Sequence, residues 1–131
     1  MKRIKVLRRI FGFHGLGESF KIAATGIVYL FFYHRNMRII FLSGIAAFLL
    51  GVHCRLRGIE LVALCITITL VFMAEMFNTA IEMVIDMSTR KYHTLIKLVK
   101  DIAAAVVLIA SLNAVAVGII LFWRRLFIPY F

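Results

Sequence analysis

Three carboxylate side chains recur in one stretch of the chain at a spacing that gives them a common helix face. At about 100° per residue, Glu82 lies about 20° to one side of Glu75 and Asp86 about 20° to the other. Asn78 and Thr79 flank these acids at about 60° and 40°. We call Glu75, Glu82 and Asp86 the carboxylate stripe. Its oxygen atoms suit a hard cation such as Mg²⁺, which shares its coordination between protein and substrate phosphates.

The carboxylate stripe lies at the polar end of an apolar segment that begins at Leu61. An ionisable side chain inside a membrane segment costs roughly 2.5 to 3.5 kcal/mol at the centre and usually marks a functional site. Because adjacent like charges repel, a cation is expected beside the stripe. The candidates are Mg²⁺ and Lys100, which stands with Asp101 where the last apolar helix is expected to begin. The alternative, a stripe that only makes structural hydrogen bonds, does not explain three acids where one amide would serve.

Membrane helices are the elements that must position these residues. Of the 131 residues, 63% are apolar, whereas a soluble domain has about 45 to 50%. Between Ile102 and Trp123 lie 22 consecutive residues without a formal charge, and about 20 suffice to cross the hydrocarbon core. The sequence therefore predicts an all-α membrane protein, a single domain over 1–131 with transmembrane helices over 36–54, 59–86 and 100–123.

A shorter amphipathic helix is expected before the first span, within a basic N-terminal region over 1–35. The apolar residues of this helix recur at the spacing of one helix face, as in a helix that lies on the membrane surface: Phe20, Ala23, Ala24, Ile27, Val28 and Phe31. The opposite side is only partly polar, so a deeper insertion as a fourth short membrane segment stays open.

The formal net charge of +10 is explained by membrane topology without nucleic acid. With the N-terminus inside, twelve Lys and Arg residues lie on the cytoplasmic side and four on the outer side. That distribution is the one the positive-inside rule favours. The outer residues are Arg55, Arg57, Arg124 and Arg125. The sequence thus predicts a multi-pass membrane protein with a cytoplasmic N-terminus and no nucleic-acid partner.

The residues around the carboxylate stripe form a pattern that resembles a known family. Residues 75–86 read EMFNTAIEMVID, and Tyr92-His93 and then Lys100-Asp101-Ile-Ala-Ala-Ala-Val follow. This pattern is similar to the prokaryotic diacylglycerol kinase and undecaprenol kinase family. The similarity extends back through residues 35–38, which read RNMR, to about Ser19.

The resemblance implies a homotrimeric bundle in the bacterial inner (cytoplasmic) membrane, which uses Mg²⁺ and ATP to phosphorylate the hydroxyl of a membrane lipid. Glu75 matches the catalytic base, Asn78 a further catalytic residue, and Glu82 a metal ligand. Contacts to the lipid are implied for Glu75 and Arg38. The implied nucleotide-binding residues are Glu82, Lys91, Tyr92, His93, Lys100 and Asp101.

Two positions depart from the pattern of this family. The family commonly carries a Glu directly before the RNMR segment, as a second metal ligand, whereas this chain has His34. Imidazole is a poor Mg²⁺ ligand compared with carboxylate. A basic residue is often found shortly before the surface helix, but residues 14–18 contain no Lys or Arg. These differences concern the details of the ATP site rather than the reaction class.

Three questions stay open at the level of sequence. The lipid could be undecaprenol or diacylglycerol. The walls of the lipid groove are expected to be apolar, with few polar groups that could bind the two esters of diacylglycerol, and this favours undecaprenol. The expected wall residues are Phe31, Phe32, Phe41 and Phe48. A rival interpretation is a non-enzymatic bundle with an acid-lined proton or cation pathway, which would not explain Lys100-Asp101 and a basic loop on the same side. The ridge of Ala110, Ala114 and Gly118 could pack within one chain or between chains.

Overall fold

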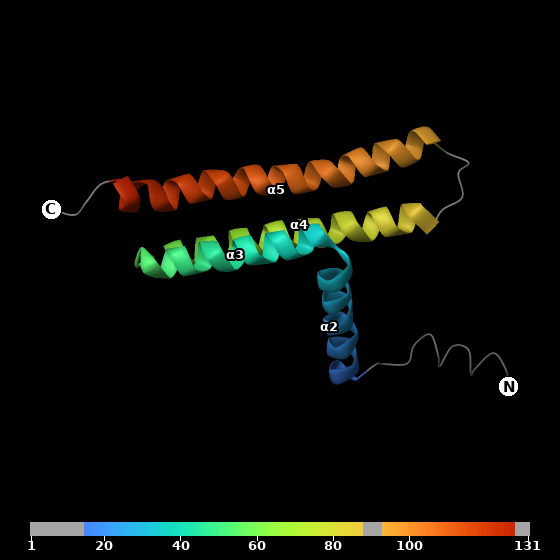
Figure 1. The fold of residues 1–131 in the computed structure, drawn as a ribbon, viewed down its shortest axis with the longest axis horizontal. Helices are drawn as coiled ribbons and strands as arrows, with labels where there is room; N and C mark the ends of the chain where they lie inside the picture. Colours follow the sequence, from blue (N-terminus) through green and yellow to red (C-terminus); the bar gives the residue numbers. More distant parts are fainter. Residues whose placement is uncertain (1–14, 88–92, 128–131) are drawn as a thin grey trace. The chain divides into compact units, whose positions relative to one another are not determined.

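The computed structural model describes residues 15–87 and 93–127, apart from the side chains of His93 and Arg124. The chain divides into two units, residues 1–33 and 34–131, which are described separately. The regular elements of the described ranges are four helices: α2 (Leu16–Tyr33), α3 (Arg35–His53), α4 (Ile59–Met87) and α5 (His93–Phe127) (Figure 1). Among these, α3, α4 and α5 are long and apolar enough to cross a membrane. The predicted all-α architecture with three candidate spans after a shorter helix is confirmed.

Helix α2 is apolar over most of its length. Its charged residues, Glu18 and Lys21, stand in the first two turns, and the rest of the helix carries no formal charge. Near its end, Tyr29 and Tyr33 stack with 4.6 Å between their ring centroids. Tyrosine is enriched at the membrane–water boundary because its ring is apolar and its hydroxyl is polar. The helix predicted before the first span is therefore present, and its aromatic end suits a membrane interface.

The second unit contains three helices that run side by side (Figure 1). Helix α4 packs against both α3 and α5, and short connections make each neighbour antiparallel to it. Helix α5 differs from the prediction, because it begins seven residues before position 100 and continues four residues past 123. The predicted bounds of this span came from the run of uncharged residues that a membrane crossing requires, and this run is shorter than the helix. A helix can continue beyond them into water wherever no residue breaks it.

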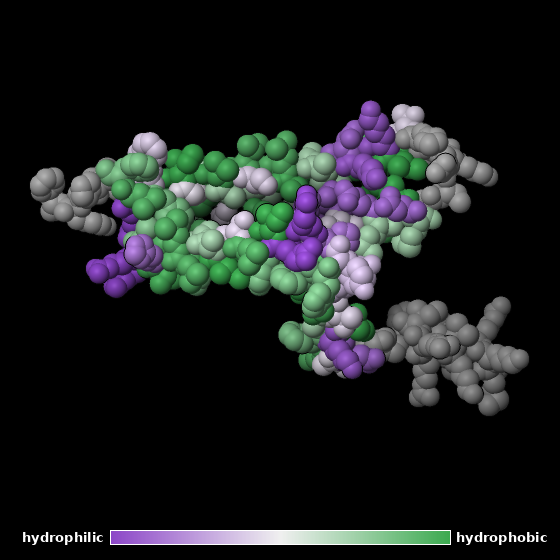
Figure 2. All heavy atoms as spheres, viewed as in Figure 1, coloured by the Kyte–Doolittle hydropathy of each residue, from purple (hydrophilic) through white to green (hydrophobic). Residues whose placement is uncertain are grey.

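The length of α4 places the carboxylate stripe at the edge of the apolar layer. Its 29 residues exceed the roughly 20 that cross a hydrocarbon core. Counted from Leu61, such a crossing ends at about Ala80. Glu75 therefore falls inside the apolar layer, whereas Glu82 and Asp86 lie beyond it. Figure 2 shows apolar residues over most of the left half of the three-helix unit, and polar residues at its left tip and across its right half, toward which α4 ends.

The turn between α3 and α4 is closed by backbone hydrogen bonds of the Schellman type. The Leu56 amide donates to the Gly51 carbonyl at 2.9 Å, and the Arg55 amide donates to the Val52 carbonyl at 3.0 Å. Arg55 takes the left-handed conformation, with φ of 56°, at the position where glycine is usual. Packing is close here, because a Cβ atom on Gly51 would lie 2.6 Å from Leu64 Cδ2.

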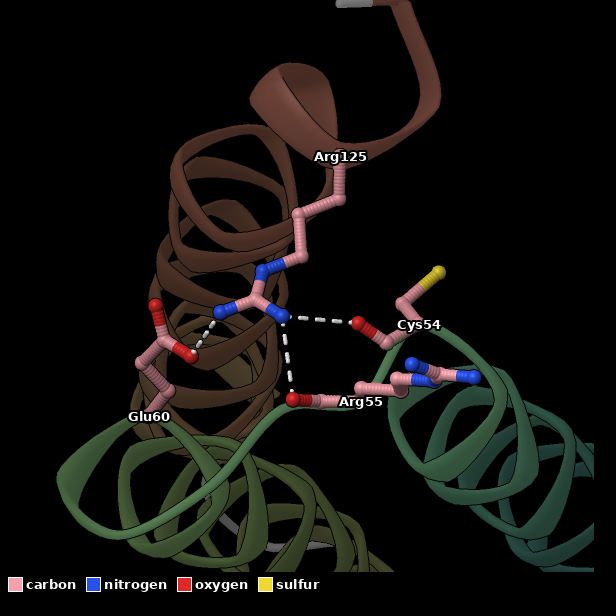
Figure 3. A network of polar contacts seen from close by, with 4 residues as sticks. All are labelled: Cys54, Arg55, Glu60 and Arg125. Atoms are coloured by element: carbon pink, nitrogen blue, oxygen red, sulfur yellow. Dashed lines mark hydrogen bonds and ion pairs between the residues drawn. The ribbon is translucent and has the colours of Figure 1, made fainter. Parts of the chain in front are cut away.

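One arginine near the end of α5 joins all three helices of this unit. The Arg125 guanidinium donates through Nη1 to the carbonyls of Cys54 at 2.8 Å and Arg55 at 2.9 Å, and through Nη2 to Glu60 Oε2 at 2.6 Å (Figure 3). Cys54 is the C-cap of α3, Arg55 follows it, and Glu60 lies in the first turn of α4. We call Arg125, Glu60 and the two carbonyls the arginine clamp. It satisfies carbonyls that the end of a helix otherwise leaves without partners.

Candidate functional site

Helix α4 is unbroken along the carboxylate stripe. The burial of the three acids differs along the helix. The side of the helix that bears Glu75 and Thr79 is buried, with Glu75 only 5% exposed. Glu82 and Asp86 are exposed. Among the residues that the structure describes, none donates a hydrogen bond to the Glu75 carboxylate. The stripe thus offers one carboxylate shielded from water and two that water-soluble ligands can reach.

Asn78 links the buried and exposed parts of the stripe. Its Nδ2 donates to Glu82 Oε1 at 3.4 Å, a long hydrogen bond. Its Oδ1 is buried and has no hydrogen-bond partner in the described part of the chain. A buried acceptor without a donor is rare in native structures and calls for an explanation such as an ion or ligand. The amide oxygen is therefore a candidate ligand atom beside Glu82.

Lys100 supplies the positive charge that the sequence predicts beside the stripe. Its Nζ lies 3.7 Å from Asp86 Oδ1, and the two side chains are 46% and 73% exposed. Exposed ion pairs of this kind contribute little stability, so the ammonium group is free to meet another anion. Asp101, the next residue, is also exposed. Because α5 begins at His93, this pair stands in the third turn, and the expectation that the helix begins at Lys100 is wrong.

The stripe has the donor chemistry for Mg²⁺ but not a complete set of ligands. Carboxylate and amide oxygens are the hard donors that Mg²⁺ takes. Within the described ranges, however, no three His, Cys, Asp or Glu side chains lie close enough to hold a metal ion. Mg²⁺ usually keeps several waters and completes its shell with substrate phosphates. The residues therefore fit a metal that arrives with a phosphate ligand and do not fit a permanently bound one.

The other predicted site residues are found in several places. Arg38 is exposed in the first turn of α3, and His34 directly precedes that helix without a side-chain capping bond. Lys91 and Tyr92 lie outside the described residues, and His93 begins α5 with a side chain that is not described. The nucleotide loop around residues 91–93 therefore stays a prediction.

An apolar groove runs between α3 and α4 on the side of Glu75 away from Glu82. It has a volume of about 350 Å³ and includes Phe41 and Phe48, two of the predicted groove walls, together with Phe72. The other two predicted walls, Phe31 and Phe32, belong to the first unit. Thr69 is one of the few polar residues of the groove, and its hydroxyl already donates to the Cys65 carbonyl at 2.9 Å. The groove thus suits a hydrocarbon chain.

The arginine clamp was missed at the level of sequence, where Arg125 counted only as an outer charge. A signal was available, since Glu60 and Arg125 stand at the same end of two antiparallel spans and carry opposite charges. The two carbonyl acceptors gave no signal, because every residue carries a carbonyl group. Their availability depends on how α3 ends.

Comparison with known proteins gives a consistent family. The model of the prokaryotic diacylglycerol kinase family matches residues 21–122. A diacylglycerol kinase of a Synechocystis species is 40% identical over 101 residues, which cover 76% of this chain and 58% of the relative. An undecaprenol kinase of Bacillus subtilis is 31% identical over 109 residues, which cover 83% of this chain and 89% of the relative. A diacylglycerol kinase of Escherichia coli is 42% identical over 68 residues, which cover 52% and 56%. The matches span less than two thirds of the Synechocystis and E. coli proteins.

Proposed function

The chain belongs to the prokaryotic diacylglycerol kinase family, and we propose that it transfers the terminal phosphate of ATP to the hydroxyl of a membrane lipid. The observation that carries this proposal is the graded burial of the carboxylate stripe. Glu75 is buried about one turn past Phe72, the last residue of α4 that lines the apolar groove. In contrast, Glu82, Asp86 and Lys100 are exposed toward the end of the same bundle. A lipid that enters from the bilayer and a nucleotide that enters from water can therefore meet along one helix face.

Glu75 is the proposed general base. Its carboxylate takes the proton of the lipid hydroxyl, and the hydroxyl oxygen forms a bond to the terminal phosphorus of ATP. The bond from that phosphorus to the bridging oxygen breaks, and ADP leaves. General bases of this kind contribute roughly 10² to 10⁴ in rate. The shielded position of Glu75 keeps competing water away from the phosphate.

The exposed part of the stripe is the proposed nucleotide site. Lys100 offsets phosphate charge, and Glu82 with the unpartnered Asn78 oxygen would hold Mg²⁺ together with the phosphates. When bound, Mg²⁺ neutralises charge that develops on the transferred phosphoryl group. Asp101 and the residues at 91–93 complete the proposed nucleotide contacts, by the family resemblance.

His34 provides a test of the metal site. If its imidazole replaces a carboxylate ligand poorly, His34→Glu should lower the Mg²⁺ concentration that gives half-maximal activity. Titration of kinase activity with Mg²⁺ measures this value, and His53→Glu, at the other end of α3, is the matched control. An unchanged or raised Mg²⁺ requirement in His34→Glu would contradict the role.

We also propose that the chain works as a homotrimer in the bacterial inner membrane, with the N-terminus and the stripe on the cytoplasmic side. The asymmetric distribution of Lys and Arg supports the orientation. Helix α5 supports assembly, because its most apolar stretch has no buried residue in the single chain. A Cβ atom on Gly118 would meet nothing within 4 Å. The small residue there is not required by packing within the chain, which favours packing between chains.

Undecaprenol is the proposed lipid. The relatives carry both names, so the preference is argued from the groove between α3 and α4. Diacylglycerol brings two esters that must be desolvated on binding. A groove without free hydrogen-bond donors makes no hydrogen bonds to the ester oxygens that would offset this desolvation. We expect a higher kcat/KM for undecaprenol than for diacylglycerol when both are presented in the same micelles.

Phosphorylation of both lipids by the purified chain, with Mg²⁺-ATP, tests the function and the preference together. A clear preference for diacylglycerol would contradict the lipid assignment and leave the kinase intact. The absence of ATP turnover with either lipid would instead favour the rival interpretation, an acid-lined proton or cation pathway. Proton flux through vesicles that contain the chain would then be measured directly.

A further inference from the structure

The arginine clamp is far from the carboxylate stripe, yet it acts on the helix that carries Lys100 and Asp101. Arg125 stands 25 residues after Lys100 in the same helix, which corresponds to about 37 Å along the axis. A hydrogen-bonded helix is stiff along its axis. A shift of α5 at one end therefore moves the other end by the same distance.

Helix α5 packs along α4 and buries Ala103, but its polar contacts with described residues of α3 and α4 are the arginine clamp and one ion pair near the stripe. None of the residues in its most apolar stretch is buried in the single chain. Its described ion pair near the stripe, between Lys100 and Asp86, is 3.7 Å long and exposed. In a membrane, apolar surfaces gain little by meeting each other rather than lipid, so interhelical hydrogen bonds carry more of the alignment.

The arginine clamp has the geometry of an alignment device. One planar guanidinium meets three acceptors at 2.6 to 2.9 Å, two on the end of α3 and one on the start of α4. A rigid fork of donors loses its fit when its acceptors move, whereas the flexible ammonium of Lys does not. The acceptors are themselves held, because two of them belong to the Schellman turn.

We propose that Arg125 is a positioning residue that sets the register of α5 against α4, and through it the position of Lys100 and Asp101 beside the carboxylate stripe. The proposal rests on the proposed kinase function, since that function gives the position of Lys100 its meaning. Arg125 does not touch the substrates in this account. Its effect reaches them through the helix.

The test compares Arg125→Ala and Arg125→Lys with Arg57→Ala in the full chain. Arg57 is exposed in the same turn and makes no hydrogen bond or ion pair with a described residue, so its removal controls for loss of an outer charge. Because displacement of Lys100 and Asp101 would weaken their charge-assisted contacts to the nucleotide, we expect Arg125→Ala to raise the KM for Mg²⁺-ATP by roughly tenfold or more. The KM for the lipid should stay unchanged. Arg125→Lys should restore part of the loss, and Arg57→Ala should match the parent chain.

A distance measurement separates register from activity. Spin labels at positions 87 and 95, both exposed, are introduced after replacement of Cys54 and Cys65, and labelled chains are diluted with unlabelled ones. In Arg125→Ala, the distribution of distances between the two labels should broaden, or its mean should shift. The shift should be about 1.5 Å for each residue by which α5 moves along α4. If Arg125→Ala does not fold, Glu60→Gln, which keeps both carbonyl bonds, replaces it.

An unchanged KM for Mg²⁺-ATP with an unchanged label distance would overturn the proposal, even if thermal inactivation became faster. If the parent chain shows no kinase activity, the proposed function fails. The label distance then still decides whether Arg125 sets the register.

Discussion

The two ends of the three-helix unit differ in how far their polar groups are satisfied by hydrogen bonds and ion pairs within the chain. At the arginine clamp, the charged group and its acceptors are satisfied within the chain at 2.6 to 2.9 Å. At the carboxylate stripe, the described contacts are 3.4 and 3.7 Å long, and a buried amide oxygen has no described partner. Groups satisfied by the protein stabilise it, whereas unsatisfied ones retain the capacity to bind a ligand. The contrast distinguishes a structural end from a functional one.

The largest expected effect on this contrast is the loss of kinase activity in Glu75→Gln, at the functional end. Loss of the general base should lower phosphorylation by roughly 10² to 10⁴. The free energy of unfolding should stay unchanged or rise, because a buried ionisable side chain in a membrane segment is costly. Kinase assays and unfolding in mixed micelles measure the two quantities, with Glu18→Gln, exposed in α2, as the control. Near-parental turnover would remove Glu75 from the role.

At the structural end, Gly51→Ala should lower stability and leave the chemistry intact. The new methyl group would lie 2.6 Å from Leu64 Cδ2 and 3.3 Å from Leu56 Cδ1, and both leucines are buried. Overpacking costs about 1 to 3 kcal/mol and better helix propensity returns up to about 1, so we expect a net loss of about 1 kcal/mol.

A double-mutant cycle with Leu64→Ala checks the cause of that loss. The added methyl group should fill part of the space that Leu64→Ala opens, so the two losses should sum to more than the loss in the double variant. Additive losses would show that the contact between residues 51 and 64 is not the cause.

The smallest expected effect is a gain in stability from Arg55→Gly. Left-handed backbone costs a residue with a Cβ atom about 1 to 2 kcal/mol, and the extra freedom of glycine in the unfolded chain removes about 0.5 to 1 of the gain. We therefore expect a gain of about 0.5 to 1 kcal/mol. Arg55→Ala, which lacks the same side chain but keeps the Cβ atom, should show no such gain in the same unfolding measurement. Equal stability of the two variants would contradict strain at this residue.

The sequence predicted the helices and the family because both depend on local patterns. Uncharged runs specified the three spans, and the helical period specified the face shared by Glu75, Glu82 and Asp86. The family membership inferred from these residues was confirmed by the match over residues 21–122. The roles of the individual site residues stay predictions.

The sequence could not specify features that depend on how the helices meet. The membrane requirement bounds an apolar run but not the helix that extends beyond it, so α5 began earlier than predicted. The burial of Glu75 depends on packing around α4, and the arginine clamp depends on free carbonyls at the end of α3. Such features follow from tertiary contacts between residues that are distant in the chain.

The arginine clamp also orders the steps by which the protein is made. Arg125 follows Cys54 by 71 residues, so the end of α3 is synthesised long before its partner leaves the ribosome. Until then, the Cys54 and Arg55 carbonyls must be hydrated or bonded elsewhere, since a membrane does not tolerate unsatisfied backbone groups. The end of α3 is therefore completed only after α5 has been synthesised, and a nascent chain that stops before α5 ends lacks the contact that closes the bundle.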